Sequence, residues 1–147
     1  MGYRFKLEAL KQYRDFQEES CQKAFSEARR IFEEEMQAYK ALVERRRKTE
    51  QVMKADRDKN TTGPQLAITA RYLERLGRQI EVQRQAVDAA QHRCEEHRQA
   101  LIEAMQKRKT LEKLKEHGLK AYLQDLNREE EQFINEIAIN RHVLNAN

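Results

Sequence analysis

Tryptophan is absent from this sequence of 147 residues, which also has only one proline, four glycines and 7% aromatic residues. Such a composition is unlike that of an average globular domain. A chain rich in Ala, Glu, Lys, Leu, Arg and Gln with almost no glycine or proline is typical of long helices or a coiled coil. So polar a chain can also be disordered, and the hydrophobic periodicity has to distinguish these two possibilities.

Long apolar runs are missing as well. No segment approaches the roughly 18 apolar residues of a membrane span, so we expect no direct membrane insertion. The first residues, MGYRFKLEAL, contain no apolar segment of the kind found in secretory signals. The length corresponds to about one domain. With only two cysteines and no such signal, we expect reduced thiols in the cytoplasm.

Motifs for catalysis are missing too. The sequence has no glycine-rich phosphate loop, no HExxH, no CxxC and only two serines. A pair of helices offers no concave pocket for a substrate. We therefore predict a protein that is not an enzyme, with no catalytic residues and no cofactor.

Cys94 and His97 would share one helical face and could in principle bind a metal. A structural zinc site needs four ligands, and the other cysteine, Cys21, is expected roughly 13 Å away along the helices. The same offset argues against a disulfide between the two cysteines. We expect a packed thiol and a histidine at the helix interface, and no metal.

The charges are numerous but mixed. The net charge of +4 comes from 29 basic and 25 acidic interspersed residues, a balance that indicates a salt-laced surface more than a nucleic-acid-binding one. The basic run RRRK, residues 45–48, points in all directions around a helix and is flanked by Glu44 and Glu50. We interpret it as solvated helix surface and expect no nucleic-acid partner.

Only one segment has the composition of a turn, DKNTTGPQ at residues 58–65. Thr62 and Gln65 fit the N-cap and N3 positions of a capping box, and Pro64 suits a first helical turn. The sequence therefore predicts a single coiled-coil domain over residues 1–147. Its expected elements are one helix over about 5–58, a turn over about 59–63 and a second helix over about 64–142.

Positions at alternating steps of three and four along the second helix are mostly apolar or small, with Gln83 and Arg108 as polar interruptions, which is the pattern of a coiled-coil interface. The positions are Leu66, Thr69, Leu73, Leu76, Ile80, Gln83, Val87, Ala90, Cys94, His97, Leu101, Ala104, Arg108 and Leu111. The first helix has a less regular stripe, interrupted by Arg14, Gln17, Glu35 and Arg45, with Phe25, Phe32 and Tyr39 beside it. Its members are Leu7, Leu10, Cys21, Ala24, Ala28, Ile31, Ala38 and Leu42.

Two helices joined by a short turn run antiparallel, and a turn near residue 62 pairs residues whose numbers sum to about 124. Residues after about 120 then have no partner within the chain. The predicted fold is all-α: a long antiparallel two-helix coiled-coil hairpin with a C-terminal helical overhang. Gly118 lies where the overhang begins and could act as a flexible joint. An unpaired polar helix is marginal in water, so we expect it to fray after Gly118 in solution.

Three segments resemble the FliJ family of flagellar export proteins, in the same order along the chain. They are the N-terminal YRFKLEALKQYRDFQEE, the post-turn ARYLERLGRQIEVQR and the C-terminal NEIAINRH. The resemblance covers the whole chain. The commonest family ending has aspartate where this sequence has Asn135, which removes one charge and leaves the pattern.

The resemblance implies a function that composition alone does not give. Members of this family are antiparallel coiled coils similar in shape to the central shaft of rotary ATP synthases. They belong to the cytoplasmic part of the flagellar type III export apparatus. The implied partners are the hexameric export ATPase, whose assembly and activity they promote, the membrane export gate protein, and export chaperones. We expect a cytoplasmic protein, peripherally associated with the inner face of the cell membrane at the flagellar base.

The resemblance also implies two contact surfaces. The ATPase-binding candidates are Phe5, Leu7, Leu10, Phe133, Ile134, Ile137 and Arg141. The export-gate candidates are Tyr72, Leu76 and Gln83, although by pattern alone Tyr72 could equally flank the helix interface. Two alternatives stay open: a stalk or adaptor of a related injectisome secretion system, and a basic nucleic-acid-binding coiled coil.

Overall fold

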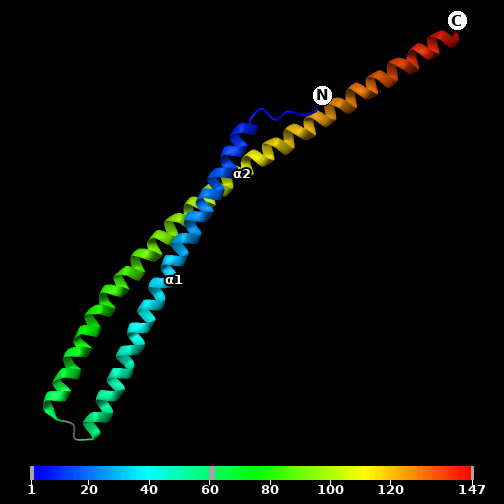
Figure 1. Ribbon diagram of the computed structural model, residues 1–147. Coiled ribbons are helices and arrows are strands. Elements are labelled where there is room, and N and C mark those ends of the chain that lie inside the picture. The colour runs from blue at the N-terminus through cyan, green and yellow to red at the C-terminus, as the bar shows by residue number, and fades with distance from the viewer. Residues whose placement is uncertain (1, 60–61, 147) are drawn as a thin grey trace. The chain divides into compact units, whose positions relative to one another are not determined.

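The computed structural model describes residues 2–59 and 62–146. It contains two helices, α1 over Glu8–Asp58 and α2 over Gly63–Ala146, and no strand among the described residues (Figure 1). The all-α prediction is therefore confirmed. Helix α1 begins at Glu8 where the periodicity predicted a start near residue 5, and α2 continues to Ala146 where an end near residue 142 was predicted. Residues 60 and 61 of the expected turn lie outside the described residues.

The sequence around the turn explains where the helices stop and start. The backbone N–H of Leu66 donates to the carbonyl of Thr62 at 3.2 Å, as expected when Thr62 is the N-cap residue of α2. Pro64 lies in the first turn, where a missing N–H removes no helical hydrogen bond. On the other side, the N–H of Lys59 donates to Asp56 at 3.1 Å and closes the last turn of α1.

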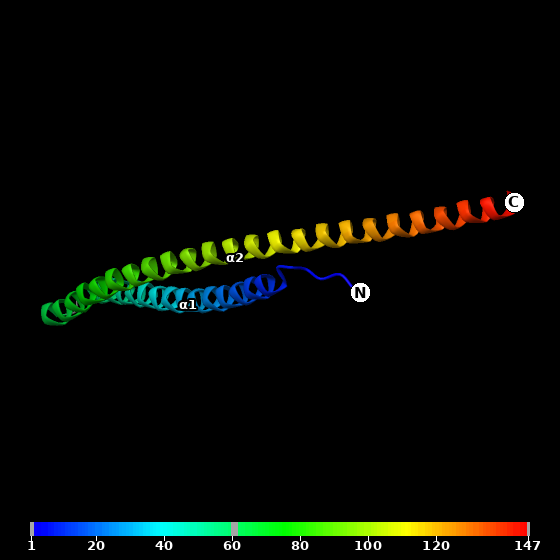
Figure 2. The same ribbon diagram turned by 90° about the horizontal axis from the view of Figure 1, so that it is seen from above.

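The chain forms two compact units. Unit 1 comprises Met1–Glu19 and Glu103–Asn147, and unit 2 comprises Ser20–Ile102. Within each unit, a segment of α1 lies beside a segment of α2 and runs in the opposite direction (Figures 1 and 2). The antiparallel helical hairpin is thus confirmed.

The interface residues predicted on α2 are the ones that the structure buries. The buried residues of α2 are Leu76, Ile80, Val87, Ala90, Ala104 and Leu111, and all belong to the predicted three-and-four pattern. Leu76 is the most enclosed, with 1% of its surface exposed. Because a narrow stripe is buried while its neighbours stay in solvent, the packing is that of a coiled coil.

The predicted stripe on α1 needs a correction. Cys21, Ala24, Ala28 and Leu42 are buried or half-buried as predicted, whereas Leu7, Leu10, Ile31 and Ala38 are exposed. The buried or half-buried positions of α1 are Glu8, Lys11, Arg14, Asp15, Gln17, Glu18, Cys21, Ala24, Phe25, Ala28, Phe32, Glu35, Met36, Tyr39, Leu42, Val43, Arg46, Thr49, Met53 and Asp56. The aromatic residues expected beside the stripe lie within it, because their rings bury more apolar area than Ile31 or Ala38 could.

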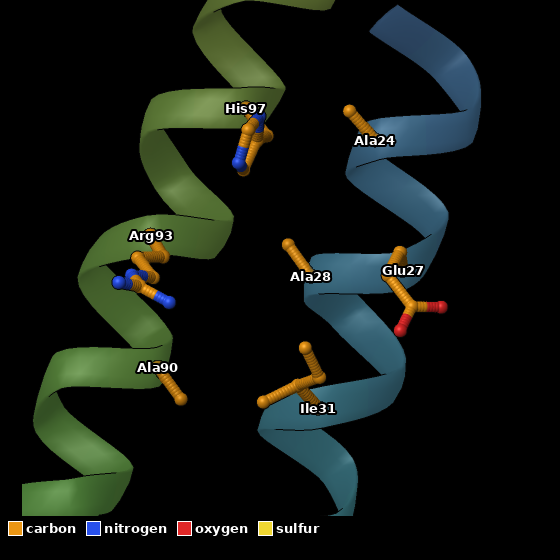
Figure 3. Close-up of a pocket in the computed structure, with 7 residues that line it drawn as sticks. All are labelled: Ala24, Glu27, Ala28, Ile31, Ala90, Arg93 and His97. Atoms are coloured by element: carbon orange, nitrogen blue, oxygen red, sulfur yellow. The ribbon is translucent and has the colours of Figure 1, made fainter.

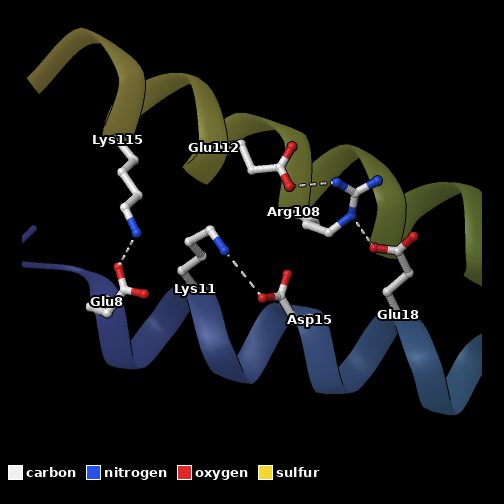
Figure 4. Close-up of polar contacts among 7 residues, drawn as sticks. All are labelled: Glu8, Lys11, Asp15, Glu18, Arg108, Glu112 and Lys115. Carbon is white, nitrogen blue, oxygen red and sulfur yellow. Dashed lines mark hydrogen bonds and ion pairs between the residues drawn. The ribbon is translucent and has the colours of Figure 1, made fainter. Parts of the chain in front are cut away.

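In unit 1 the helices are joined by charged side chains (Figure 4). The Nζ atom of Lys115 lies 2.9 Å from a carboxylate oxygen of Glu8, and the Arg108 guanidinium donates to both Glu18 and Glu112. These hydrogen bonds, first to Glu112 and then to Glu18, raise the pKa of Arg108. The paired residue numbers sum to 123 for Glu8–Lys115 and to 126 for Glu18–Arg108, close to the expected 124.

Candidate partner-binding surfaces

The C-terminal part of α2 has no helix packed against it in unit 1. Tyr122 is the last half-buried residue, and every described residue from Leu123 to Ala146 is exposed. The apolar side chains on this segment therefore remain in solvent: Phe133 is 63% exposed, Ile134 62% and Ile137 40%. Unpaired apolar side chains on a helix are the usual form of an anchor that docks into a groove of a partner.

Most of these side chains lie on one face, which we call the tail stripe. Its members are Leu119, Leu123, Leu126, Phe133, Ile134, Ile137, Arg141 and Leu144. At 3.6 residues per turn they fall within an arc of about 100°. Four of the predicted ATPase contacts therefore share one surface. Ile139 and Val143 are also exposed but lie on the other side of the helix, so they provide an internal comparison.

The N-terminal candidates occupy two different environments. Phe5 precedes α1 and is half-buried, whereas Leu7 and Leu10 are 41% and 38% exposed. The charged interface of unit 1 explains the exposure, because Glu8 and Lys11 take the positions that face α2. Leu7 and Leu10 are thus available to a partner in the same unit as the tail stripe.

The export-gate candidates also differ in accessibility. Tyr72 is 39% exposed and lines a shallow hollow of about 320 Å³ between the helices of unit 2, together with Val52 and Ile68. Leu76 lies one helical turn away but is buried in the interface. A partner at this surface would therefore touch Tyr72 directly, whereas Leu76 is enclosed within the chain.

The third gate candidate, Gln83, has a partner within the chain. Its side-chain amide donates to the backbone carbonyl of Glu35 at 2.9 Å and also to the Glu35 carboxylate. Both residues interrupted the apolar patterns of their helices, and the structure pairs the two interruptions. Such a pair fixes helix register, since a shift would leave half-buried polar groups without partners. Their residue numbers sum to 118.

A second hollow, of about 230 Å³, lies in unit 2 where small residues meet across the interface (Figure 3). Ala28 of α1 lies on the side of Ala90 of α2, and Ala24 lies opposite His97. His97 is exposed although its spacing predicted an interface position. Within the part of the chain that the structure describes, no cluster of three potential metal ligands occurs, and both cysteines are free.

The remaining charged surface consists largely of ion pairs within one helix. In the basic run, Arg47 pairs with Glu44 at 2.6 Å and Arg46 lies 3.9 Å from Glu50. The hydrogen bond from Arg47 lowers the pKa of Glu44. These pairs neutralise positive charge that a nucleic-acid surface would present to phosphates, in agreement with a solvated helix face.

The structure defines an antiparallel helical coiled coil in which the apolar stripe at the C-terminal end of the described residues is exposed. The chain belongs to the FliJ family, since the model of the family described as Flagellar FliJ protein matches residues 3–147. A protein from Chlamydia trachomatis described as a homologue of YscO has the same fold, with a TM-score of 0.65, 20% sequence identity and 97% of each chain covered. No curated protein matches the sequence.

Family membership identifies a coiled-coil protein related to type III secretion. The family consists of structural and escort proteins and is not a family of enzymes. Neither helix has, among its described residues, a stretch long and apolar enough to cross a membrane.

Proposed function

We propose that this protein is a stalk-like component of the bacterial flagellar type III export apparatus. In this proposal it binds the hexameric export ATPase, promotes the assembly and activity of the ring, and links it to the membrane export gate protein and export chaperones. The chain acts mechanically and hydrolyses nothing itself. It works in the cytoplasm, peripherally associated with the inner face of the membrane at the flagellar base.

The observation that carries this proposal is the tail stripe. Leu123–Ala146 form a helix whose apolar side chains have no partner in the described chain. A solvent-exposed apolar face of this length is typical of a surface that another molecule covers. An ATPase ring with an apolar lining would provide such a cover, with Leu7 and Leu10 as contacts from α1.

The two candidate surfaces occupy different units, which suits a protein that connects two partners. The tail stripe, Leu7 and Leu10 belong to unit 1, and Tyr72 with its hollow belongs to unit 2. In the proposal, the export ATPase takes the first surface and the gate protein the second. The two contacts should then be separable by mutation.

The proposal is tested with the cognate export ATPase. Its turnover and its hexamer content are measured with the full chain and with residues 1–126, which lack Phe133, Ile134, Ile137 and Arg141. We expect stimulation by the full chain and none by the truncation. Equal stimulation by both would move the contact to α1, and no stimulation by either would refute the ATPase-binding function.

The alternatives have distinct signatures. A stalk of an injectisome would stimulate the ATPase of that system in preference to a flagellar one. A nucleic-acid-binding coiled coil would lose affinity by orders of magnitude between about 50 and 200 mM salt, because phosphate contacts release counterions. Apolar docking of the tail stripe should change little over the same range.

A further inference from the structure

The segment before α1 is not helical and lies against α2. Residues 2–6 alternate in exposure: Tyr3 and Phe5 are half-buried, whereas Gly2, Arg4 and Lys6 are exposed. This period of two is the pattern of an extended segment with one face covered. We call residues 2–7 the N-terminal strap.

The strap is held mainly by Tyr3. Its ring lies 5.7 Å from the ring of Tyr122, centroid to centroid, at a tilt of 41°. Its hydroxyl lies 3.5 Å from the carbonyl of Lys115, at the outer limit of a hydrogen bond. The salt bridge between Glu8 and Lys115 fixes the point where the strap leaves α1.

Gly118 forms the seat for this tyrosine. A Cβ atom added at Gly118 would lie 2.1 Å from the hydroxyl oxygen of Tyr3 and 3.1 Å from its Cζ atom. Non-bonded carbon and oxygen atoms do not approach so closely. Any larger residue at position 118 would therefore displace the Tyr3 ring. The glycine is therefore needed for close approach of Tyr3, in a helix where glycine is otherwise unfavourable.

The same glycine makes α2 weak at this point. Glu8, the first residue of α1, reaches α2 at Lys115, so the α1 helix gives no support at Gly118. Beyond Tyr122 every described residue is exposed. The three atoms that would lie nearest to a Cβ atom at Gly118 all belong to Tyr3 of the strap.

We propose that the N-terminal strap is a releasable lock on a hinge at Gly118. With Tyr3 seated, the helix is continuous from the paired region into the tail. With the strap released, Gly118 is the point at which α2 opens and the tail moves independently. The contacts described between Tyr3 and α2 are a tilted ring pair and a long hydrogen bond, which are individually weak interactions.

Hydrogen exchange of the full chain tests this lock. Tyr3→Ala should speed amide exchange over residues 115–126 about fivefold, the equilibrium change that corresponds to the loss of one aromatic pair. Gly118→Ala should slow exchange there, because alanine strengthens the helix, and in that background Tyr3→Ala should have no further effect. Unchanged exchange in Tyr3→Ala, or the same increase in both backgrounds, would overturn the proposal.

A second measurement tests the seat itself and does not depend on helix stability. The NMR contact between the rings of residues 3 and 122 should be present in the wild type and lost in Gly118→Ala. It should return when Gly118→Ala is combined with Tyr3→Phe, because that change removes the hydroxyl at 2.1 Å and leaves Cζ at 3.1 Å as the nearest atom. A ring contact that persists in Gly118→Ala alone would refute the seat.

Discussion

Replacing Ile134 with alanine tests whether the tail stripe is the surface that binds the export ATPase. Ile134 is 62% exposed and lies on the stripe. Ile139 is 60% exposed and lies five positions further along the same helix, on its other side. The two residues differ in the direction they face and in little else, so Ile139→Ala is the matched control.

The size of the effect follows from the exposed area. Isoleucine to alanine removes three carbon atoms, and each is worth about 0.8 kcal/mol when transferred from water to an apolar site. Because Ile134 keeps 62% of its surface in solvent in the free chain, about 1.5 kcal/mol remains to be gained on docking. Its loss corresponds to a roughly tenfold weaker Kd. Any change in helix propensity is the same in both variants.

The assay is a calorimetric titration of the full-length variants into the cognate export ATPase, with ATPase turnover measured in parallel. We expect Ile134→Ala to weaken binding and shift half-maximal stimulation to higher concentration, while Ile139→Ala matches the wild type. Equal losses in both variants would show that the tail acts through general helix stability. Wild-type binding by Ile134→Ala would refute the tail stripe as the contact surface.

Three further predictions concern stability and the second surface. Glu18→Ala removes one of two carboxylates bound by Arg108, and since the two side chains are 19% and 22% exposed the unfolding free energy should fall by about 1 kcal/mol in urea titrations; no change would contradict a stabilising role. Hydrogen bonds from neighbouring arginines lower the pKa values of Glu27 and Glu81, so the stability these carboxylates contribute is present above pH 4.5 and is lost as the pH falls below it. Thermal unfolding at low salt should show a lower Tm at about pH 3 than at pH 7, and an equal or higher Tm would contradict this. Tyr72→Ala should weaken binding to the export gate protein and leave ATPase stimulation intact; loss of both would mean that the two surfaces are not separate.

The sequence alone determined the helices and the interface of α2. A single turn-forming segment limits a chain of this composition to two long helices, and their unequal lengths leave the C-terminal part of α2 unpaired. The α2 interface was predictable because Leu76, Ile80 and Val87 are large aliphatic residues at regular spacing. The tail stripe followed from the same counting, although the sequence does not identify what covers it.

The tertiary structure decided which face of α1 turns inward. Leu7 and Leu10 are more hydrophobic than Glu8 and Lys11, so the sequence favoured the leucines as interface residues. The structure instead places Glu8 and Lys11 at half-buried positions, and Glu8 forms an ion pair with Lys115 across the interface. The hydrophobic pattern of α1 can be read from α1 alone. The ion pairs across the interface depend on which residues of α2 lie opposite.

The contact between Tyr3 and Gly118 was hidden for a related reason. The sequence indicated Gly118 as a flexible joint, but Tyr3 is separated from it by more than a hundred residues, and no local pattern links a tyrosine to a distant glycine. Only the folded chain brings the Tyr3 ring against Gly118, where the absence of a Cβ atom leaves room for it. Periodicity therefore determined where the helices lie, and complementary charge and close packing determined which residues meet.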